Sequence, residues 1–206
     1  MLLLENPPIE NKEFTDKKFS DCEYLNMSFQ GCIFQHCSFK GTSMLGLAAD
    51  NCRFLECRFD YARLNEAAFS NCELTGCRFD YASLLWAAFS QCKAMGSIFA
   101  DASLTGTAFE DGNFSMASFQ RCDLRKFLFE NMNFEQADFR DCNLKQARFL
   151  KCDLNHALLN GADLSQADLT GARMDGVDFS SAKLKKTKIN IEQAVLIAQS
   201  IGAVVV

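Results

Sequence analysis

A period of five residues runs through nearly the whole chain. From Phe14 to Ile189, every fifth residue is apolar, and it is large at all but two of the thirty-six successive positions. Nineteen of the 20 Phe residues fall in this register. The residue two places before each of these centres is usually small, most often Cys or Ala, and the remaining positions are mainly polar. A helix repeats every ~3.6 residues and a strand every two, so a strict period of five requires a chain that turns every five residues.

A second period, of twenty residues, predicts how these turns close. Residues 57–76 match residues 77–96 at thirteen of twenty positions. Four five-residue sides therefore form one coil, and successive coils stack at the inter-strand distance of about 4.8 Å. The register predicts an all-β solenoid of about nine four-sided coils, which is a rod roughly 43 Å long. Stacking buries the apolar surface that a single coil cannot bury.

The repeat gives way to a helical pattern at the C-terminus. Asn190 is suited to be the N-cap of a short α-helix, and Gln193, three residues later, can complete a capping box. We expect an N-terminal cap segment over residues 1–11, the repeats over 12–191, and a capping and dimerisation helix with its tail over 192–206. The face predicted to cover the last coil consists of Ile191, Ala194, Val195 and Ala198.

A second apolar stripe on this terminal segment has no obvious partner within the rod. We interpret it as the interface of a homodimer. The predicted interface residues are Leu196, Ile197, Ile201 and Val204.

Three places break the pattern of large centres and small preceding residues. Ala49 is small for a centre, but Leu47 precedes it, so the two residues are expected to exchange roles and conserve volume. Ala94 lacks this compensation and predicts a cavity, or Met95 turned inward. Phe127 places a ring in a small position, and we expect it to widen its coil or to turn outward.

The repeated motif resembles that of the pentapeptide-repeat family, most clearly in ADLSQADLTG at residues 162–171. The resemblance covers residues 12–191 and implies a right-handed quadrilateral β-helix. The terminal sequence KINIEQAVLIAQSIGAVVV is similar to the C-terminal helix of the quinolone-resistance (Qnr-type) and mycobacterial gyrase-inhibiting members, and this similarity implies head-to-head homodimers. The unbroken register departs from Qnr-type members that carry loops protruding from the rod.

Composition and spacing argue against an enzyme. All 11 cysteines lie two places before a centre, where a small buried residue is needed, so we interpret them as packing residues. His36 and His156 are six coils apart and cannot share a metal. A rod filled by its own side chains leaves no cavity for a small-molecule substrate, so neither a catalytic site, a cofactor nor a metal is expected.

Charge and hydropathy narrow the choice of partners. A net charge of −5 gives no basic surplus for direct binding of nucleic acid. No apolar run reaches the roughly 20 residues of a membrane span, and no signal peptide is recognised. Unpaired cysteines indicate a reducing compartment, so we expect a cytoplasmic protein that does not bind membranes.

With these classes set aside, the expected function is binding to another protein. The family resemblance implies a protein that imitates DNA and interacts with DNA gyrase or topoisomerase IV, giving fluoroquinolone protection. The sides centred on Phe14 and Phe29 carry a small acidic surplus, far below the one charge per ~1.7 Å of duplex DNA. The alternative is a scaffold for an unknown protein partner. The acidic candidates for the partner surface are Asp50, Glu110, Asp111, Glu130 and Glu135. The apolar candidates are Leu25, Leu45, Leu85 and Trp86.

Overall fold

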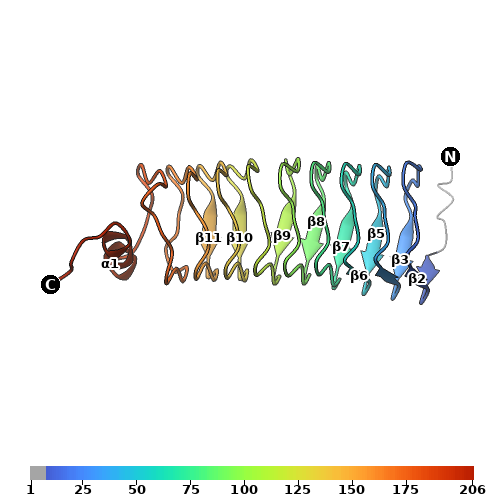
Figure 1. The fold of residues 1–206 in the computed structure, drawn as a ribbon, viewed down its shortest axis with the longest axis horizontal. Helices are drawn as coiled ribbons and strands as arrows, with labels where there is room; N and C mark the ends of the chain where they lie inside the picture. The colour runs from blue at the N-terminus through green and yellow to red at the C-terminus, as the bar shows by residue number, and fades with distance from the viewer. Residues whose placement is uncertain (1–7) are drawn as a thin grey trace.

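The protein is a four-sided parallel β-solenoid closed at one end by a helix (Figure 1). The computed structural model describes residues 8–206. Its short strands and its helix are β1 (Ile9–Glu10), β2 (Glu13–Thr15), β3 (Ser28–Gln30), β4 (Ile33–Gln35), β5 (Ala48–Asp50), β6 (Arg53–Leu55), β7 (Ala68–Ser70), β8 (Ala88–Ser90), β9 (Ala108–Glu110), β10 (Leu128–Glu130), β11 (Arg148–Leu150) and α1 (Ile191–Ser200).

Every ladder joins residues twenty apart, which confirms the predicted coil. We name each side of the rod after its first centre. The Phe29 side holds the eight-stranded sheet β1-β3-β5-β7-β8-β9-β10-β11, and the Phe14 side holds β2-β4-β6. The Phe19 and Tyr24 sides pair through single parallel bridges, such as Lys18 with Ser38 and Glu23 with Ser43. The predicted fold class is therefore confirmed.

The chain turns at the residue two places after most centres, where the backbone is left-handed. The φ angle there ranges from +50° at Asn11 to +81° at Gly171. Few side chains adopt this region without strain, and Asn, Asp and Gly adopt it most easily. Tyr61 and Trp86 also occupy such corners, with φ of +59° and +60°. This turn is the reason that five residues suffice for one side.

The centres form stacked columns inside the rod. The rings of Phe34 and Phe54 lie 4.8 Å apart and nearly parallel, and those of Phe79 and Phe99 lie 4.7 Å apart. Offset and stacked ring pairs stabilise by about 1 kcal/mol beyond their burial. The columns thus carry both the hydrophobic burial and the register from coil to coil.

The irregular centre at Ala94 is filled differently from either expectation. Met95 is 45% exposed, so the prediction that it turns inward is wrong. The ring of Phe114, one coil further, lies 6.3 Å from Phe89 and 6.1 Å from Phe99, the two rings that flank Ala94 in its own coil. We attribute the loss of the parallel stack here to Phe114 leaning into the space above the small side chain.

The small position is also a hydrogen-bonding position. The Cys57 thiol donates to the carbonyl of Phe34, 23 residues earlier, at 3.3 Å. The hydroxyl of Thr42 donates to the carbonyl of Phe19 at 2.8 Å in the same way. Cys, Ser and Thr are therefore suited to this position because they are small and also tie one coil to the preceding one.

The C-terminal helix caps the last coil through a face different from the predicted one. Leu196 and Ile197 pack against the core, whereas Ile191 is 86% exposed and Ala194 is also exposed. Of the predicted face, Ile191 and Ala194 point outward because Gln193 is the residue that turns inward, whereas Val195 and Ala198 are half-buried. Its buried amide Nε2 donates to main-chain carbonyls of the preceding coils.

Gln193 satisfies the backbone that a further coil would otherwise pair. Its Nε2 donates to the carbonyl of Leu169 at 2.6 Å and to that of Ala172 at 2.8 Å. Its Oε1 accepts from the N–H of Asn190, whose side chain accepts from the Gln193 N–H, so the predicted capping box is present. At the other end, residues 1–7 of the predicted cap segment lie outside the described residues, and Ile9 and Glu10 form β1, which pairs with β3.

Candidate functional site

Phe127 opens a cleft in the side of the rod. The equivalent position holds Ala67, Ala87 and Ala147 in other coils. The Phe127 ring is half-buried and contacts two rings of the core, lying 5.5 Å from Phe129 and 6.3 Å from Phe109. Its position agrees with the expectation that it widens its coil.

The ring separates the two coils that it lies between. Phe109 and Phe129 are 6.1 Å apart and tilted by 38°, whereas Phe89 and Phe109, one coil earlier, are stacked at 5.1 Å. Strands β9 and β10 retain a single paired residue, Glu110 with Glu130, whereas β8 and β9 pair over three residues. The wider spacing between β9 and β10 is visible in Figure 1.

The main-chain ladder is open along two adjacent sides. One coil earlier the ladder is intact, as the bonds from Leu84 to Ser103 at 2.9 Å and from Trp86 to Thr105 at 3.0 Å show. Within residues 8–206, the corresponding bonds between the next two coils are not formed on the Tyr24 side and at the start of the Phe29 side, before the pair formed by Glu110 and Glu130. The donors left unpaired are the N–H groups of Leu104, Gly106, Asp123 and Leu128. The carbonyls that would accept from these N–H groups, and are left without them, are those of Ala102, Thr107, Asp123 and Arg125.

Side-chain contacts hold the two coils at the ends of this opening. At one corner, Arg121 makes a bidentate pair with Asp101, with Nη2 2.6 Å from Oδ2 and Nε 2.9 Å from Oδ1. The guanidinium lowers the pKa of the Asp101 carboxyl. At the other corner, Asn131 donates to Asp111 at 3.1 Å. The ladder on the Phe14 side is intact, with Phe114 donating to the carbonyl of Asn133 at 2.8 Å.

The resulting Phe127 cleft is an open surface feature of about 670 Å³. This is within the usual range of ligand-binding pockets. Its floor is aromatic, one end carries Arg125 and Lys126, and the other end carries carboxylates. The residues that line it are Gly106, Thr107, Ala108, Phe109, Glu110, Asp111, Arg125, Lys126, Phe127, Leu128, Glu130 and Asn131.

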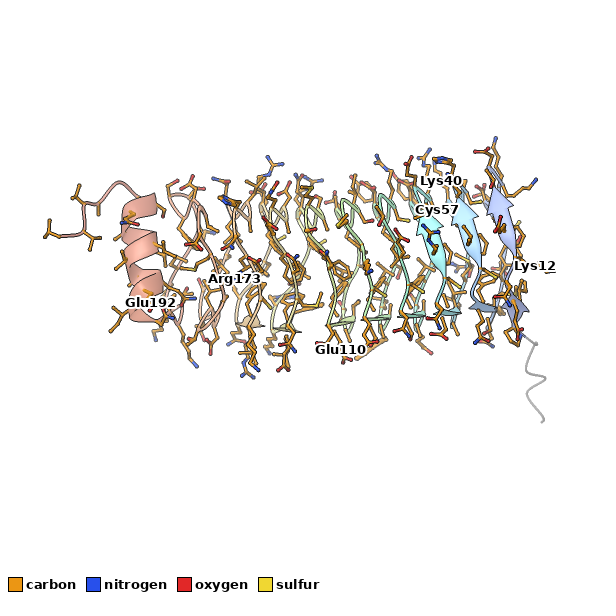
Figure 2. The ribbon with its side chains drawn as sticks, turned by 90° about the horizontal axis from the view of Figure 1, so that it is seen from below. Lys12, Lys40, Cys57, Glu110, Arg173 and Glu192 are labelled. Atoms are coloured by element: carbon orange, nitrogen blue, oxygen red, sulfur yellow. The ribbon has the colours of Figure 1, made fainter. Side chains whose placement is uncertain are left out.

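Three of the five acidic candidates meet at this cleft. Glu110 and Glu130 face each other across the opening, and Asp111 lies at the adjacent corner. Figure 2 shows Glu110 at the outer rim of the rod. Asp50 belongs to the same ladder but lies three coils away, and Glu135 lies on the Phe14 side. The structure therefore divides the predicted acidic surface into one cluster and two outlying residues.

The apolar candidates form a broken column. Leu25 is 55% exposed and Trp86 is 67% exposed, whereas Leu45 and Leu85 are half-buried. Asn65 occupies the place between the latter two. The Trp86 indole covers Gly106, where an added Cβ would lie 2.3 Å from the ring. Trp86 thus packs at the edge of the Phe127 cleft.

Sequence reasoning missed an exposed aromatic pair beside this column. Tyr61 and Tyr81 stack at 5.2 Å, and the Lys40 ammonium lies 5.8 Å from the Tyr61 ring. Both tyrosines are more than half exposed. Their spacing of twenty residues could have identified them, because it places residues at the same corner of successive coils.

A buried carboxylate was also missed. Asp60 is 3% exposed and accepts hydrogen bonds from Arg58 at 3.0 Å and Arg78 at 3.3 Å. Asp80 lies one coil further, and burial, together with the nearby Asp60 carboxylate, raises the pKa of Asp80. We interpret this cluster as a tie between coils, since both arginines are held by it.

The cysteines are part of the packing. All except Cys22 are buried. Burial raises the pKa of Cys92 to about 11 and that of Cys122 to about 12, which keeps these groups as thiols. Cys52 differs, because the neighbouring Cys72 thiol lowers the pKa of Cys52 to about 7.

Within residues 8–206, no cluster of three or more His, Cys, Asp or Glu side chains has an arrangement that could hold a metal ion. In the same part of the chain, no helix has the length and apolarity needed to cross a membrane.

Comparison with known proteins yields two family matches. A family described as the pentapeptide repeat region matches residues 48–119 and 113–194. A second, described as the SV2A/B/C luminal domain, matches residues 2–79. No curated protein sequence matches the chain.

Solved structures resemble the chain along most of its length. Full-length QnrB1, described as a plasmid-mediated fluoroquinolone resistance protein, is 22% identical with a TM-score of 0.74, over 95% of this chain and 99% of that chain. A trypsin-treated form of QnrB1 is 23% identical with a TM-score of 0.63, over 96% and 99%. HetL from the cyanobacterium Nostoc sp. strain PCC 7120, a pentapeptide repeat protein involved in heterocyst differentiation regulation, is 17% identical with a TM-score of 0.55, over 90% and 91%. These similarities establish the fold as the right-handed quadrilateral β-helix.

Proposed function

The chain belongs to the pentapeptide-repeat family, and we propose that it is a non-enzymatic binding protein that interacts with DNA gyrase or topoisomerase IV and protects it from fluoroquinolones. The observation that carries this proposal is the full-length similarity of the rod to QnrB1, a fluoroquinolone resistance protein. Gyrase acts on chromosomal DNA, so the proposal implies a cytoplasmic protein. No direct contact with nucleic acid is proposed.

The charge of the rod limits the form of this interaction. Duplex DNA carries about one charge per 1.7 Å, whereas this chain has a net charge of −5. General electrostatic imitation of DNA is therefore weak. We propose that contacts are local and centre on the acidic cluster formed by Glu110, Asp111 and Glu130, with Asp50 and Glu135 contributing less.

We further propose that the protein acts as a homodimer joined at the C-terminal helix. Leu196 and Ile197 already pack on the core of their own rod, so they serve mainly as the cap. Ile201 is 60% exposed and Val204 is 87% exposed, and these two residues remain available to a second copy. The double variant Ile201→Asp/Val204→Asp should be monomeric by light scattering with an almost unchanged thermal melt. A variant that remains dimeric would exclude this interface.

The topoisomerase proposal is tested in a supercoiling assay. The purified protein, at micromolar concentration, should raise the fluoroquinolone concentration that half-inhibits gyrase. The triple variant Glu110→Lys/Asp111→Lys/Glu130→Lys should lose this effect, whereas the matched double variant Asp50→Lys/Glu135→Lys should retain most of it. A native protein that alters neither gyrase nor topoisomerase IV, with or without drug, would refute the proposal.

The second candidate function is a scaffold for another protein. It is favoured by the exposed aromatic residues Tyr61, Tyr81 and Trp86, which occupy strained corners on two adjacent edges of the rod. The two functions depend on different surface residues, so substitutions can distinguish them. Tyr61→Asn/Tyr81→Asn should leave a topoisomerase effect intact and should abolish binding to a partner that uses the aromatic edge.

A further inference from the structure

We propose that the Phe127 cleft is a docking site for an extended segment of a partner protein, which binds by adding its main chain to the opened edges of the two coils. The cleft differs from a general concave surface because its walls carry unpaired main-chain groups. Peptide backbone is the ligand that offers N–H and C=O groups at the spacing of a β-ladder.

The unpaired groups on both walls support this choice of ligand. The N–H groups of Leu104 and Gly106 have no acceptor within the described part of the chain, and neither has that of Leu128 on the opposite wall. Unpaired donors and acceptors at a sheet edge are a template for a further strand. A partner segment that pairs with them recovers the main-chain hydrogen bonds that the Phe127 ring prevents.

The shape of the cleft determines which part of it can be occupied. The floor of the cleft, formed by the aromatic rings, is narrow, because the ring centroids of Phe109 and Phe129 are only 6.1 Å apart. A strand inserted fully between two coils would need about twice the 4.8 Å strand spacing, and the floor does not allow this. The segment must therefore lie in the outer part of the cleft, with small or aliphatic side chains toward the exposed side of Phe127 and Leu128.

The charges at the two ends of the cleft determine the ends of the segment. Lys126 lies at the corner near Gly106, and no carboxylate lies within 4.0 Å of its ammonium among residues 8–206. Glu110 and Glu130 lie at the opposite end, about four residues of extended chain away, which is roughly 13 Å. A partner segment therefore matches the charges of the cleft when it places an acidic side chain near Lys126 and a basic side chain near Glu110 and Glu130.

The opening is preformed. The Asp101–Arg121 pair at one corner and the Asp111–Asn131 pair at the other hold the coils, and the Phe14 side remains hydrogen-bonded. A segment therefore binds without unfolding a coil. This inference does not require that the partner be a topoisomerase, so it can fail or succeed independently of the supercoiling assay.

The first test measures amide hydrogen exchange in the free protein. The amides of Leu104, Gly106 and Leu128 should exchange about tenfold faster than those of Leu84, Trp86 and Ala108, which occupy the same places one coil earlier and are hydrogen-bonded. Equal protection in the two coils would show a closed ladder and would overturn the proposal.

The second test uses a defined peptide, acetyl-Glu-Val-Ala-Val-Lys-amide, at millimolar concentration in an NMR titration of the full-length protein. The peptide should shift and protect the same three amides while leaving their counterparts one coil earlier unchanged. The same peptide with both Val nitrogens methylated has the same side chains but lacks two main-chain donors, and it should bind at least several-fold more weakly. Equal binding of the two peptides, or no shift with either, would overturn strand addition.

Two protein variants sharpen this result. Phe127→Ala restores the small residue of the other coils, so the ladder should close and peptide binding should be lost while the protein stays folded. Lys126→Glu keeps the cleft but reverses its charge at one end, and it should weaken the peptide several-fold. Unchanged binding to Phe127→Ala would show that the peptide binds elsewhere.

Discussion

Leu47 and Phe127 occupy the same position in two different coils, and only one of them opens the rod. Both are large residues in a position meant for a small one. Beside Leu47 the centre is Ala49, and β5 pairs with both β3 and β7 over three residues. Beside Phe127 the centre is still Phe129, and β10 pairs with β9 at one residue only.

The difference shows that the sum of the two side-chain volumes, rather than either one alone, controls the backbone ladder. Leu47 and Ala49 together fill about the volume of the usual Ala and Phe, so both are buried and the Ala68 N–H still donates to the Leu47 carbonyl at 2.7 Å. Phe127 and Phe129 exceed that volume. Because a packed interior does not compress, the coils separate instead.

The largest expected effect comes from removing a central ring in each region. Phe149 lies in a coil whose ladder is closed, since β11 pairs with β10 over three residues. Phe149→Ala should reduce the free energy of unfolding by about 3–5 kcal/mol, the usual loss for a buried Phe. Phe129→Ala should reduce it by much less, because Phe127 can then move inward as Leu47 does and the ladder can close. Denaturant unfolding measures both values. Equal losses would show that Phe127 cannot replace the missing ring.

The converse substitution should open the closed region. Ala49→Phe with Leu47 retained reproduces the excess volume of the Phe127 coil and should destabilise the protein by about 2 kcal/mol. The amide of Ala68 should then exchange faster. The double variant Leu47→Ala/Ala49→Phe restores the usual pair and should recover both properties, which a double-mutant cycle detects as strong coupling. A single variant as stable as the parent protein would contradict the volume rule.

A smaller effect is expected where the small position stays small and apolar but loses its donor. The Cys142 thiol donates to the carbonyl of Phe119 at 2.8 Å in a closed coil, so Cys142→Ala should reduce the free energy of unfolding by about 1 kcal/mol. Cys22 is exposed, and Cys22→Ala serves as the matched control with almost no effect. If both variants have the same stability, the thiol contact between coils contributes nothing.

The smallest effect is a pH dependence at the corner of the opening. The Arg121 guanidinium lowers the pKa of Asp101, so the pair stabilises the folded protein above the ordinary carboxyl pKa of about 3.9 and loses this contribution as the pH falls through the lower folded value. Asp101→Asn should therefore lower the melting temperature at about pH 6 more than at about pH 2. An equal difference at both pH values would show that the pair acts through packing alone.

The sequence predicted the coil because its two periods are local and repeated. A residue such as Phe34 recurs at Phe54 in the same column, and this redundancy identifies the four sides even where one centre is irregular. The C-terminal helix was predicted with its capping box, but only part of its predicted inward face, Val195 and Ala198, is half-buried. The reason is that the carbonyls of Leu169 and Ala172 at the end of the rod need a donor, which the Gln193 amide supplies, and the sequence does not show those carbonyls.

The sequence identified the residue that opens the cleft, but it did not predict the cleft itself. Phe127 was recognised as too large for its position, yet nothing in the sequence states whether the ring leaves the core or the coils move apart. That outcome depends on the rings around it and on the pairs at the corners. The acidic residues Glu110 and Glu130 were selected for their side of the rod, and the structure showed that they face each other across the opening.

The sequence by itself determined the coil length, the four sides and the positions that point inward, because each of these follows from a period that the chain repeats without interruption. The tertiary structure alone decided where the hydrogen-bond ladder fails, which residues face the opening and which side chains satisfy the last coil. Periodicity determines which residues stack, whereas the fit between stacked side chains depends on the combined volumes of side chains in neighbouring coils. A single large ring at Phe127 therefore changes backbone contacts in the coil before its own.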